Sequence, residues 1–348
     1  MPNDNFHVGI TSDFYTDAKG KFESILEAKF SNIPNITVAP IPARPDNIAL
    51  LEDIDQFDAI FALATKFTAQ SVANAKRLAL ISRWGVGYDM IDVPALTEAG
   101  IALAITPGAV RRPVAEAILA LLFALTTNLV IQDKLVRQGG WRGQLPSLGR
   151  NMKGRVLGSV GCGNIAGELF SMSRSLGFGR LIAHDPFITT AQAAALGVEL
   201  VPLEEVFAQS DFVTINLPLS APTKGLIGFE LLRKMKPTAY LINTSRGPIV
   251  NEADLVFVLE QRMIAGAGLD VFEQEPLPAS SKLHKMDNVI LAPHALAWTE
   301  ELARDNSMEA CDNILMLHGG QVPASLVNRE VTAQPQFQMK LEAFRRIL

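Results

Sequence analysis

The sequence predicts an α/β protein in which strands and helices alternate along the chain. Short apolar runs, typical of buried strands, recur as far as position 292, and stretches with helical spacing separate them. A glycine-rich turn joins one of these strands to the helix that follows it. Of the 348 residues, 48% are hydrophobic and 19% are charged, so we expect two domains with large apolar cores rather than a disordered chain.

The first hundred residues predict a small α/β unit of their own. A glycine loop at 83–89 directly follows the fourth expected strand, and Pro107 and Gly108 are expected to break the chain after the fifth. Helical patterns separate the strands, as in other units that alternate strand and helix. The five expected strands are residues 6–10, 36–41, 57–63, 78–82 and 101–105.

Residues 114–130 are nearly all apolar and are predicted to form one long helix. A helix that is apolar on all sides must be buried on all sides. We therefore expect this helix to occupy a core position and also to contact a second subunit.

Residues 156–185 carry the pattern of a dinucleotide-binding unit. A β-branched, apolar strand at 156–160 runs into the turn GCGNIA, in which Gly161 permits a tight turn and Gly163 lets a diphosphate approach the backbone. The small Ala166 lets the next helix pack closely, and Asp185 ends the following strand, where a ribose-binding acid belongs. The alternative is a unit whose glycines only make a tight turn.

The alternation continues after the glycine turn. Residues 299–317 have a helical pattern, and the stretch after Leu317 is too short for a domain. We expect that stretch to return to the first unit, which would make the first unit discontinuous. Together with 156–160, the expected strands 181–183, 199–201, 212–216, 239–243, 265–271 and 289–292 make seven strands of a doubly wound sheet.

Composition excludes several classes of function. A net charge of −5 offers no basic field for nucleic acid, and the apolar run 117–125 is too short to cross a bilayer. Cys162 and Cys311 are the two cysteines, so neither a disulfide framework nor a zinc cluster is expected, and Cys162 is interpreted as a small filler. We expect a cytoplasmic protein with no nucleic-acid, membrane or metal partner, since the N-terminus lacks a signal-peptide core.

Three stretches place reactive side chains where strands of the second half end, the edge at which open α/β sheets bind ligands. Arg246 follows 239–243 and could bind a carboxylate through two hydrogen bonds. Asp270 and Glu275 follow the next strand, and His294 follows the last strand through a proline. Histidine is the natural acid or base near neutral pH. The alternatives are a surface arginine, a solvated acidic loop and a structural histidine.

Seven motifs in order resemble the D-isomer-specific 2-hydroxyacid dehydrogenases over nearly the whole chain. That family includes phosphoglycerate dehydrogenases, glyoxylate/hydroxypyruvate reductases and D-lactate dehydrogenases. The motifs are ISRWGVGYDMID, TPGAVRRPVAEAILALL, VGCGNIAG, HDP, NTSRGPIVNEADL, GLDVFEQEPLP and LAPHALAWTEE.

The resemblance implies a doubly wound Rossmann domain that binds the cofactor, at residues 108–298. This domain would be inserted into a smaller, flavodoxin-like α/β substrate domain made of residues 1–107 and 299–348. The family also implies a homodimer.

The resemblance further implies an NAD-dependent enzyme that interconverts a D-2-hydroxy acid and its 2-keto acid. Arg246, Glu275 and His294 would be the catalytic trio, with Arg246 and His294 also contacting the substrate. Val86 and Gly87 would offer backbone N–H groups to the substrate carboxylate. The implied cofactor residues are Gly161, Gly163, Asn164, Ile165, Asp185, Pro218, Thr244, Ser245 and Asp270.

Further residues bear on the coenzyme, the substrate and an alternative function. Asp185 predicts NAD(H) over NADP(H), because it would repel a 2′-phosphate. Arg111 and Arg112 could meet a second anionic group of the substrate, or they could simply be solvated at the start of a helix.

Dehydrogenase-like transcriptional corepressors share this fold and trio but act as NAD-responsive binding proteins. The short ends of this chain argue against that alternative.

Residues 295–298 read ALAW, unlike the commoner glycine-rich family pattern. The resemblance therefore leaves the roof of the substrate pocket open. Glu275 and Val86 depart from the glutamine of formate dehydrogenases and the lysine of phosphite dehydrogenases at the matching positions, which disfavours both activities.

Overall fold

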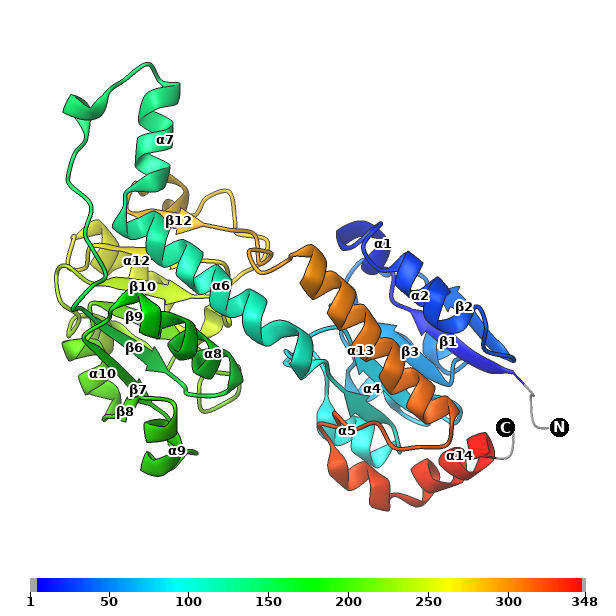
Figure 1. The fold of residues 1–348 in the computed structure, drawn as a ribbon. Helices are drawn as coiled ribbons and strands as arrows, with labels where there is room; N and C mark the ends of the chain where they lie inside the picture. Colours follow the sequence, from blue (N-terminus) through cyan, green and yellow to red (C-terminus); the bar gives the residue numbers. More distant parts are fainter. Residues whose placement is uncertain (1–4, 346–348) are drawn as a thin grey trace. The chain divides into compact units, whose positions relative to one another are not determined.

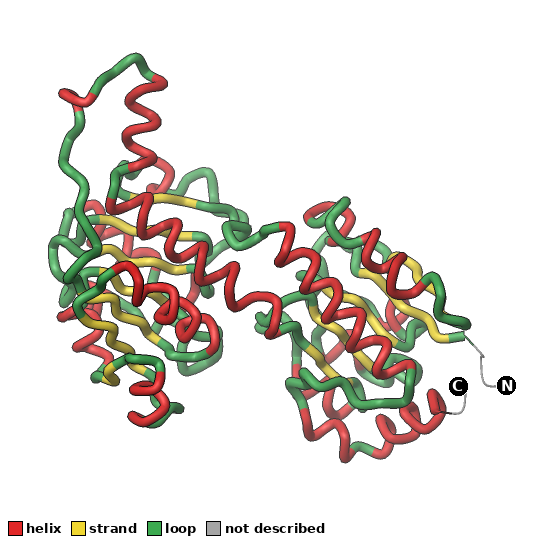
Figure 2. The backbone as a smooth tube through the Cα atoms, in the orientation of Figure 1, coloured by secondary structure: helices red, strands yellow, loops and turns green. Residues whose placement is uncertain are grey.

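The computed structural model describes residues 5–345, and in it the chain divides into two compact units. Unit 1 runs to Val110 and resumes at Trp298, and unit 2 comprises Arg111–Ala297. Each unit contains a parallel sheet with helices packed on it (Figures 1 and 2). The predicted fold class is confirmed.

Unit 1 has a five-stranded sheet in the order β2-β1-β3-β4-β5, with all neighbours parallel. This order is the flavodoxin-like one. All five expected strands are present. They are β1 (Phe6–Ile10), β2 (Ile36–Pro40), β3 (Ala59–Ala62), β4 (Leu80–Arg83) and β5 (Ala102–Ala104).

The C-terminal helices of the chain belong to unit 1. Helix α13 packs on α2 and β4, where Ser82 donates a 2.9 Å hydrogen bond to the carbonyl of Ala310. In α14, the Lys340 ammonium reaches the carbonyl of Leu78 at 2.6 Å. The helices are α1 (Phe14–Asp17), α2 (Glu23–Phe30), α3 (Leu51–Ile54), α4 (Ala69–Val72), α5 (Val93–Glu98), α13 (Glu300–His318), the 3₁₀ helix η5 (Arg329–Ala333) and α14 (Pro335–Arg345).

Unit 2 has a seven-stranded, all-parallel sheet in the order β12-β11-β10-β9-β6-β7-β8. The chain starts in the middle at β6, winds outward to β8, and then returns to β9 on the other side of β6. This reversal creates the switch point where doubly wound sheets bind ligands. The strands are β6 (Val156–Val160), β7 (Arg180–His184), β8 (Glu199–Leu200), β9 (Phe212–Ile215), β10 (Tyr240–Asn243), β11 (Gly266–Leu269) and β12 (Val289–Leu291).

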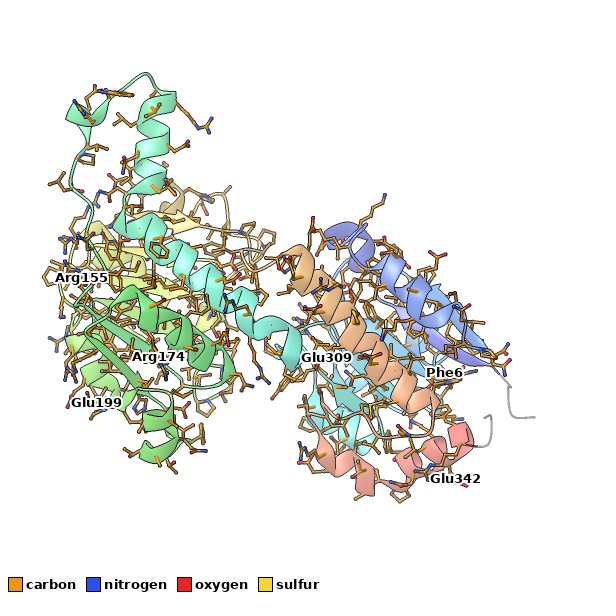
Figure 3. The ribbon with its side chains drawn as sticks, in the orientation of Figure 1. Phe6, Arg155, Arg174, Glu199, Glu309 and Glu342 are labelled. Carbon is orange, nitrogen blue, oxygen red and sulfur yellow. The ribbon has the colours of Figure 1, made fainter. Side chains whose placement is uncertain are left out.

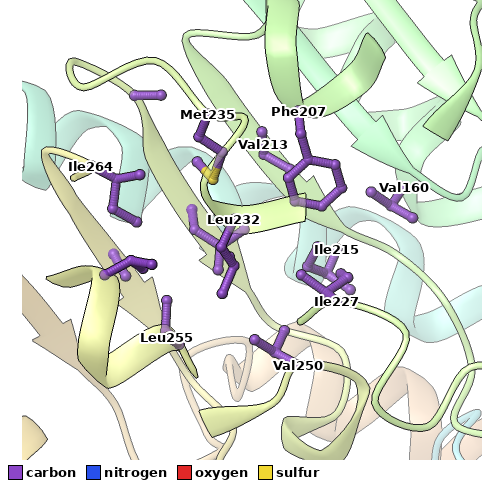
Figure 4. Close-up of a cluster of buried hydrophobic side chains, with 14 of the residues drawn as sticks. Val160, Phe207, Val213, Ile215, Ile227, Leu232, Met235, Val250, Leu255 and Ile264 are labelled. Atoms are coloured by element: carbon purple, nitrogen blue, oxygen red, sulfur yellow. The ribbon is translucent and has the colours of Figure 1, made fainter. Parts of the chain in front are cut away.

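Two apolar clusters cover the two faces of this sheet. On one face, α6 and α8 pack their apolar residues against Leu157, Phe212 and Ile242. On the other face, α10, α11 and α12 pack against β6, β9 and β10 (Figure 4). The helices are α6 (Pro107–Thr126), α7 (Leu129–Arg137), η1 (Arg142–Gln144), α8 (Asn164–Ser173), η2 (Arg174–Leu176), α9 (Thr190–Ala195), α10 (Leu203–Gln209), α11 (Phe229–Leu232), η3 (Gly247–Ile249), α12 (Glu252–Glu260) and η4 (Lys282–Lys285).

A buried aspartate, Asp211, joins the N-terminal ends of the central strands. Its carboxylate accepts the N–H of Val156 at 2.9 Å and pairs with Lys236 at 3.2 Å and Arg155 at 3.5 Å (Arg155 is labelled in Figure 3). These bonds fix β6 beside β9 at the edge opposite the strand ends that carry the predicted site.

The prediction of one helix at 114–130 is wrong in its bounds. Helix α6 starts at Pro107, because proline is well tolerated at the first helical position, where its missing N–H costs nothing. The helix stops at Thr126, and Asn128 adopts a left-handed backbone (φ 54°) before α7 begins. In the single chain the burial is incomplete, since Phe123 is 43% exposed and α7 projects from unit 2 (Figure 1), and the expected contact with a second subunit stays a prediction.

Among residues 5–345, no single helix is long and apolar enough to cross a membrane. The bent pair α6 and α7, whose axes differ by 59°, passes the same test of length and composition only when taken together.

Candidate active site

Every predicted site residue of unit 2 lies at the C-terminal edge of its sheet. The strands are all parallel, so their carboxyl ends meet at one edge. Loops that are far apart in sequence therefore meet there. Gly161 follows β6, Asp185 follows β7, Pro218 follows β9, Thr244, Ser245 and Arg246 follow β10, Asp270 and Glu275 follow β11, and His294 follows β12.

His294 and Glu275 form a hydrogen-bonded pair at this edge. Nδ1 of His294 lies 2.8 Å from Oε2 of Glu275, and Oε1 of Glu275 accepts the N–H of Phe272 at 2.9 Å. Burial alone would raise the pKa of Glu275, but the bond to His294, with the charge of Arg246 and the Phe272 N–H, holds it below its ordinary value. The pair thus joins an ionised carboxylate to an imidazole that remains partly exposed.

The loop that carries Arg246 is shaped by Asn243, the buried last residue of β10. The Asn243 side chain donates to the carbonyl of Arg246 at 3.0 Å and accepts the N–H of Ser245 at 3.0 Å. The Arg246 guanidinium donates to the Ser245 carbonyl at 2.7 Å. Sequence reasoning did not assign Asn243 this role, although a polar residue ending an apolar strand was a usable signal.

Gly247 brings the arginine loop into contact with the loop that carries Glu275. A Cβ atom at Gly247 would collide with the backbone carbonyl of Phe272 and the nitrogen of Glu273. Only a glycine permits this approach. The backbone next to Arg246 therefore packs against the Phe272 backbone, and the N–H of Phe272 bonds to the Glu275 carboxylate.

The glycine turn has the shape that a diphosphate requires. Gly161 has φ 93°, and a Cβ there would meet the backbone of Asn216. A Cβ on Gly163, by contrast, would meet nothing within 4 Å. Helix α8 starts at Asn164 and continues through Ile165, so its first-turn N–H groups begin at this open position.

Asp185 can accept hydroxyl groups in addition to its present bonds. Oδ2 accepts the N–H of Cys162 at 2.8 Å, and Oδ1 accepts the N–H of Phe187 at 2.8 Å. Each carboxylate oxygen has a further lone pair. The turn and this acid therefore fit the diphosphate and ribose of a dinucleotide such as NAD.

The remaining cofactor candidates lie in two loops that are tied together. Ser245 donates its hydroxyl to the carbonyl of Leu217, which links the loop after β10 to the loop after β9. The carbonyl of Pro218 accepts the hydroxyl of Thr223 at 2.7 Å. Thr244 precedes Ser245 at the same strand end.

Val86 and Gly87 belong to unit 1, in the loop after β4. Gly85, next to them, donates its N–H to Thr106 Oγ1 at 2.7 Å, and that hydroxyl donates to Asn306 of α13 at 2.6 Å. Thr106 and Asn306 are buried and escaped the sequence reasoning, which considered only the glycine loop itself.

Two other sequence candidates have local structural explanations. Arg112 pairs with Glu116 at 2.5 Å and with Glu168 at 3.3 Å, so its charge is balanced within unit 2. This favours the interpretation of Arg112 as a solvated helix residue over that of an anion site. Burial and Asp185 raise the pKa of the Cys162 thiol to about 11, so the thiol is protonated and unreactive, as expected of a filler.

Comparison with known proteins decides the family. A sequence profile described as D-isomer specific 2-hydroxyacid dehydrogenase, NAD binding domain, matches residues 119–295. A glyoxylate reductase of Korarchaeum cryptofilum is 39% identical over 303 residues, which is 85% of this chain and 91% of that protein. The chain belongs to the D-isomer specific 2-hydroxyacid dehydrogenase family.

Two further relatives support the assignment to this family. A D-3-phosphoglycerate dehydrogenase of Synechocystis is 38% identical over 280 residues, covering 80% of this chain and 50% of that protein. The crystal structure of a glyoxylate reductase from Paecilomyes thermophila superposes with a TM-score of 0.82 at 28% identity, over 94% of this chain and 99% of that one.

Membership of the D-isomer specific 2-hydroxyacid dehydrogenase family confirms the predicted enzyme class, an NAD-dependent D-2-hydroxyacid dehydrogenase. The matched NAD binding domain falls inside unit 2, which carries the glycine turn and Asp185.

Proposed function

We propose that this enzyme reduces a small 2-keto acid to the D-2-hydroxy acid with NADH and catalyses the reverse oxidation. The observation that carries the proposal is the 2.8 Å bond between His294 and Glu275 at the ligand-binding edge of the NAD-binding unit. An imidazole oriented by a carboxylate is suited to exchange a proton with a carbonyl oxygen at neutral pH.

His294 is the proton donor in this proposal. Its Nδ1–H bonds to Glu275, which leaves Nε2–H to face the substrate. NADH, when bound, supplies the hydride to the carbonyl carbon. The proton from Nε2 goes to the carbonyl oxygen, and neutral His294 remains. Glu275 stabilises the charged imidazolium before transfer, and in the oxidation direction neutral His294 takes the hydroxyl proton.

Arg246 binds the substrate carboxylate and polarises the ketone in this scheme. A guanidinium can hold a carboxylate through two parallel hydrogen bonds. Its loop is fixed by Asn243 and Gly247, which supports a positioned rather than a mobile arginine. The backbone N–H groups of Val86 and Gly87 would also bind the substrate carboxylate, as the family resemblance implies.

Glyoxylate is the first substrate to test. The relatives named glyoxylate reductase, at 37–39% identity, support a small 2-keto acid. A rate assay would follow the loss of NADH absorbance with glyoxylate, hydroxypyruvate, pyruvate and a bulky aromatic 2-keto acid. We expect the smallest acids to have the highest kcat/KM. Turnover of none of the four would contradict the proposed reaction.

We propose NAD(H) as the preferred coenzyme. Asp185 carries a negative charge where the adenosine ribose would bind, so it would accept the ribose hydroxyls and repel a 2′-phosphate. The assay is kcat/KM for NADH and NADPH in the wild type and in Asp185→Ser. Asp185→Ser should lower the preference for NADH over NADPH. Equal kcat/KM with both coenzymes in the wild type would exclude the proposed preference for NAD(H).

We also propose a homodimer built on the arm formed by α7 and residues 138–151. Exposed apolar side chains gather on this arm and on the adjoining part of α6, which is unusual for a surface that faces only water. Sedimentation should give a dimer, and Leu129→Asp with Val136→Asp should give a monomer. The exposed residues are Phe123, Leu129, Val130, Val136, Trp141 and Leu148.

A further inference from the structure

A buried carboxylate, Asp270, lies directly beneath the loop that carries His294. Asp270 follows β11, and its own N–H continues the sheet by bonding to the Asn243 carbonyl at 3.0 Å. The residue is only 5% exposed. Oδ1 accepts the N–H groups of Ala295 at 3.1 Å and Leu296 at 3.2 Å, and Oδ2 lies 3.3 Å from the Leu296 nitrogen.

These two amides immediately follow His294, where the chain turns sharply. After β12 the backbone passes through Pro293 and reaches His294 with φ 53°, in the left-handed region. Residues other than glycine rarely adopt this conformation, and they do so when their surroundings impose it. In this loop, the hydrogen bonds that the Asp270 carboxylate accepts from Ala295 and Leu296 can impose this backbone conformation on His294.

We propose that Asp270 is a positioning residue, which holds the backbone after His294 and thereby fixes the imidazole against Glu275. The inference rests on the proposed acid–base role of His294 and goes beyond the coenzyme contact that the family resemblance implies for Asp270. Its physical basis is that two backbone donors converge on one buried carboxylate, so removing the carboxylate leaves both amides without their acceptor.

The position of this carboxylate favours such a role over a contribution to stability. Burial raises the pKa of Asp270 in spite of the opposing bonds from Leu296 and Ala295 and the charge of His294. The nearby charge of Glu275 acts in the same direction as burial. Folding therefore keeps an acid where its ionised form is disfavoured, next to the proposed proton donor.

The anchoring can be measured without coenzyme or substrate. Hydrogen exchange of the coenzyme-free protein, followed by mass spectrometry, reports on the peptide that spans residues 289–302. In Asp270→Ala the Ala295 and Leu296 amides should exchange about tenfold faster or more, and in Asp270→Asn, which keeps one acceptor oxygen, by an intermediate factor. Unchanged exchange in both variants would overturn the proposal.

The matched control is Asp287→Asn. Asp287 precedes β12 at its other end and forms an exposed pair with Arg262. This variant should leave exchange at 295–296 and the rate of reduction unchanged. If Asp287→Asn accelerated exchange there as much as Asp270→Asn did, the effect would be a general loosening of β12. A specific role of Asp270 in holding the Ala295 and Leu296 amides would then be excluded.

Kinetics then separate positioning from coenzyme binding. In Asp270→Ala, kcat at saturating NADH should fall by about 10- to 100-fold, because a small displacement of a catalytic group has effects of that size. The Kd of NADH, measured by its fluorescence, should rise by a smaller factor than kcat falls, because the glycine turn and Asp185 are unchanged. Weaker NADH binding with an unchanged kcat would mean that Asp270 serves the coenzyme alone, and would overturn the positioning role.

An inactive wild type would refute the proposed function, whereas the exchange experiment would still decide whether Asp270 holds the Ala295 and Leu296 amides.

Discussion

Nδ1 of His294 lies 2.8 Å from Oε2 of Glu275, although the two residues come from loops after different strands. The contact is possible because β11 and β12 are neighbours in register, with Leu269 opposite Leu291. The other oxygen of Glu275 is held by the Phe272 N–H at 2.9 Å. The imidazole therefore meets a carboxylate whose orientation is already fixed, and this contact can orient an acid–base histidine.

Replacing His294 by alanine should remove the proton donor and leave the coenzyme site intact. We expect kcat/KM for keto-acid reduction to fall by about 10²- to 10⁴-fold, the usual contribution of a general acid. The Kd of NADH should stay near the wild-type value, since the glycine turn and Asp185 are unchanged. Near-wild-type turnover in His294→Ala would exclude the histidine as the acid and reopen the binding-protein alternative.

Replacing Glu275 by glutamine should slow the reaction without removing the imidazole. The change takes away the carboxylate that lies 2.8 Å from Nδ1 of His294 and balances the charge that the imidazole carries as a proton donor. We expect kcat/KM for keto-acid reduction to fall by about 10- to 100-fold and the Kd of NADH to stay near the wild-type value. The measurement is kcat/KM of both proteins with one accepted keto acid, and equal values would contradict the role of Glu275.

The lowered pKa of Glu275 also has a consequence for stability. A carboxyl whose folded pKa is lowered stabilises the folded state at pH values above its unfolded pKa. That contribution is lost as the pH falls through the folded pKa. Because both side chains remain partly exposed, we expect the difference in acid unfolding between wild type and Glu275→Gln to be small.

The two glycines of the turn should fail in different ways when replaced by alanine. Gly161→Ala forces a side chain into a left-handed position against the Asn216 backbone, and should destabilise unit 2 by roughly 1–2 kcal/mol or more. Gly163→Ala adds a methyl group in open space, so the Tm should not change, but NADH should bind roughly tenfold more weakly or worse. Thermal unfolding and NADH titration of both variants test this contrast.

His318 should make the stability of unit 1 dependent on pH. The side chain is buried at the end of α13, edge-on to the ring of Phe6 (labelled in Figure 3) at 5.2 Å. Burial lowers the pKa of His318, although the charge of Asp58 opposes the shift. The neutral form is thus favoured in the folded state, so stability is full above the unfolded pKa of about 6.5 and is lost as the pH falls below it.

The test is urea unfolding at about pH 8 and about pH 5. His318→Phe keeps an aromatic ring beside Phe6 and removes the titration, so its loss of stability on acidification should be smaller than that of the wild type. His284→Gln, which changes an exposed histidine of unit 2, is the control and should behave as the wild type does. An equal loss in all three proteins would show that other groups govern the acid response.

Much of the fold and the class of chemistry could be predicted from the sequence. Short runs of strand-forming residues marked each of the twelve strands found within residues 5–345, because a strand is recognised largely from its own side chains. The spacing from Gly161 to Asp185 predicted the dinucleotide site, since the glycines and the acid have fixed places in one local unit. The ordered motifs then indicated the family and the trio Arg246, Glu275 and His294.

The contacts that hold these residues in place could not be predicted from the sequence. The apolar pattern of 114–130 did not reveal the left-handed Asn128, because hydrophobic spacing says little about a single backbone turn. The bonds from Phe272 to Glu275, and from Ala295 and Leu296 to Asp270, use backbone N–H groups, which are the same in every residue except proline. A side-chain pattern cannot show which of them meet a carboxylate, because that depends on how β10, β11 and β12 pack side by side.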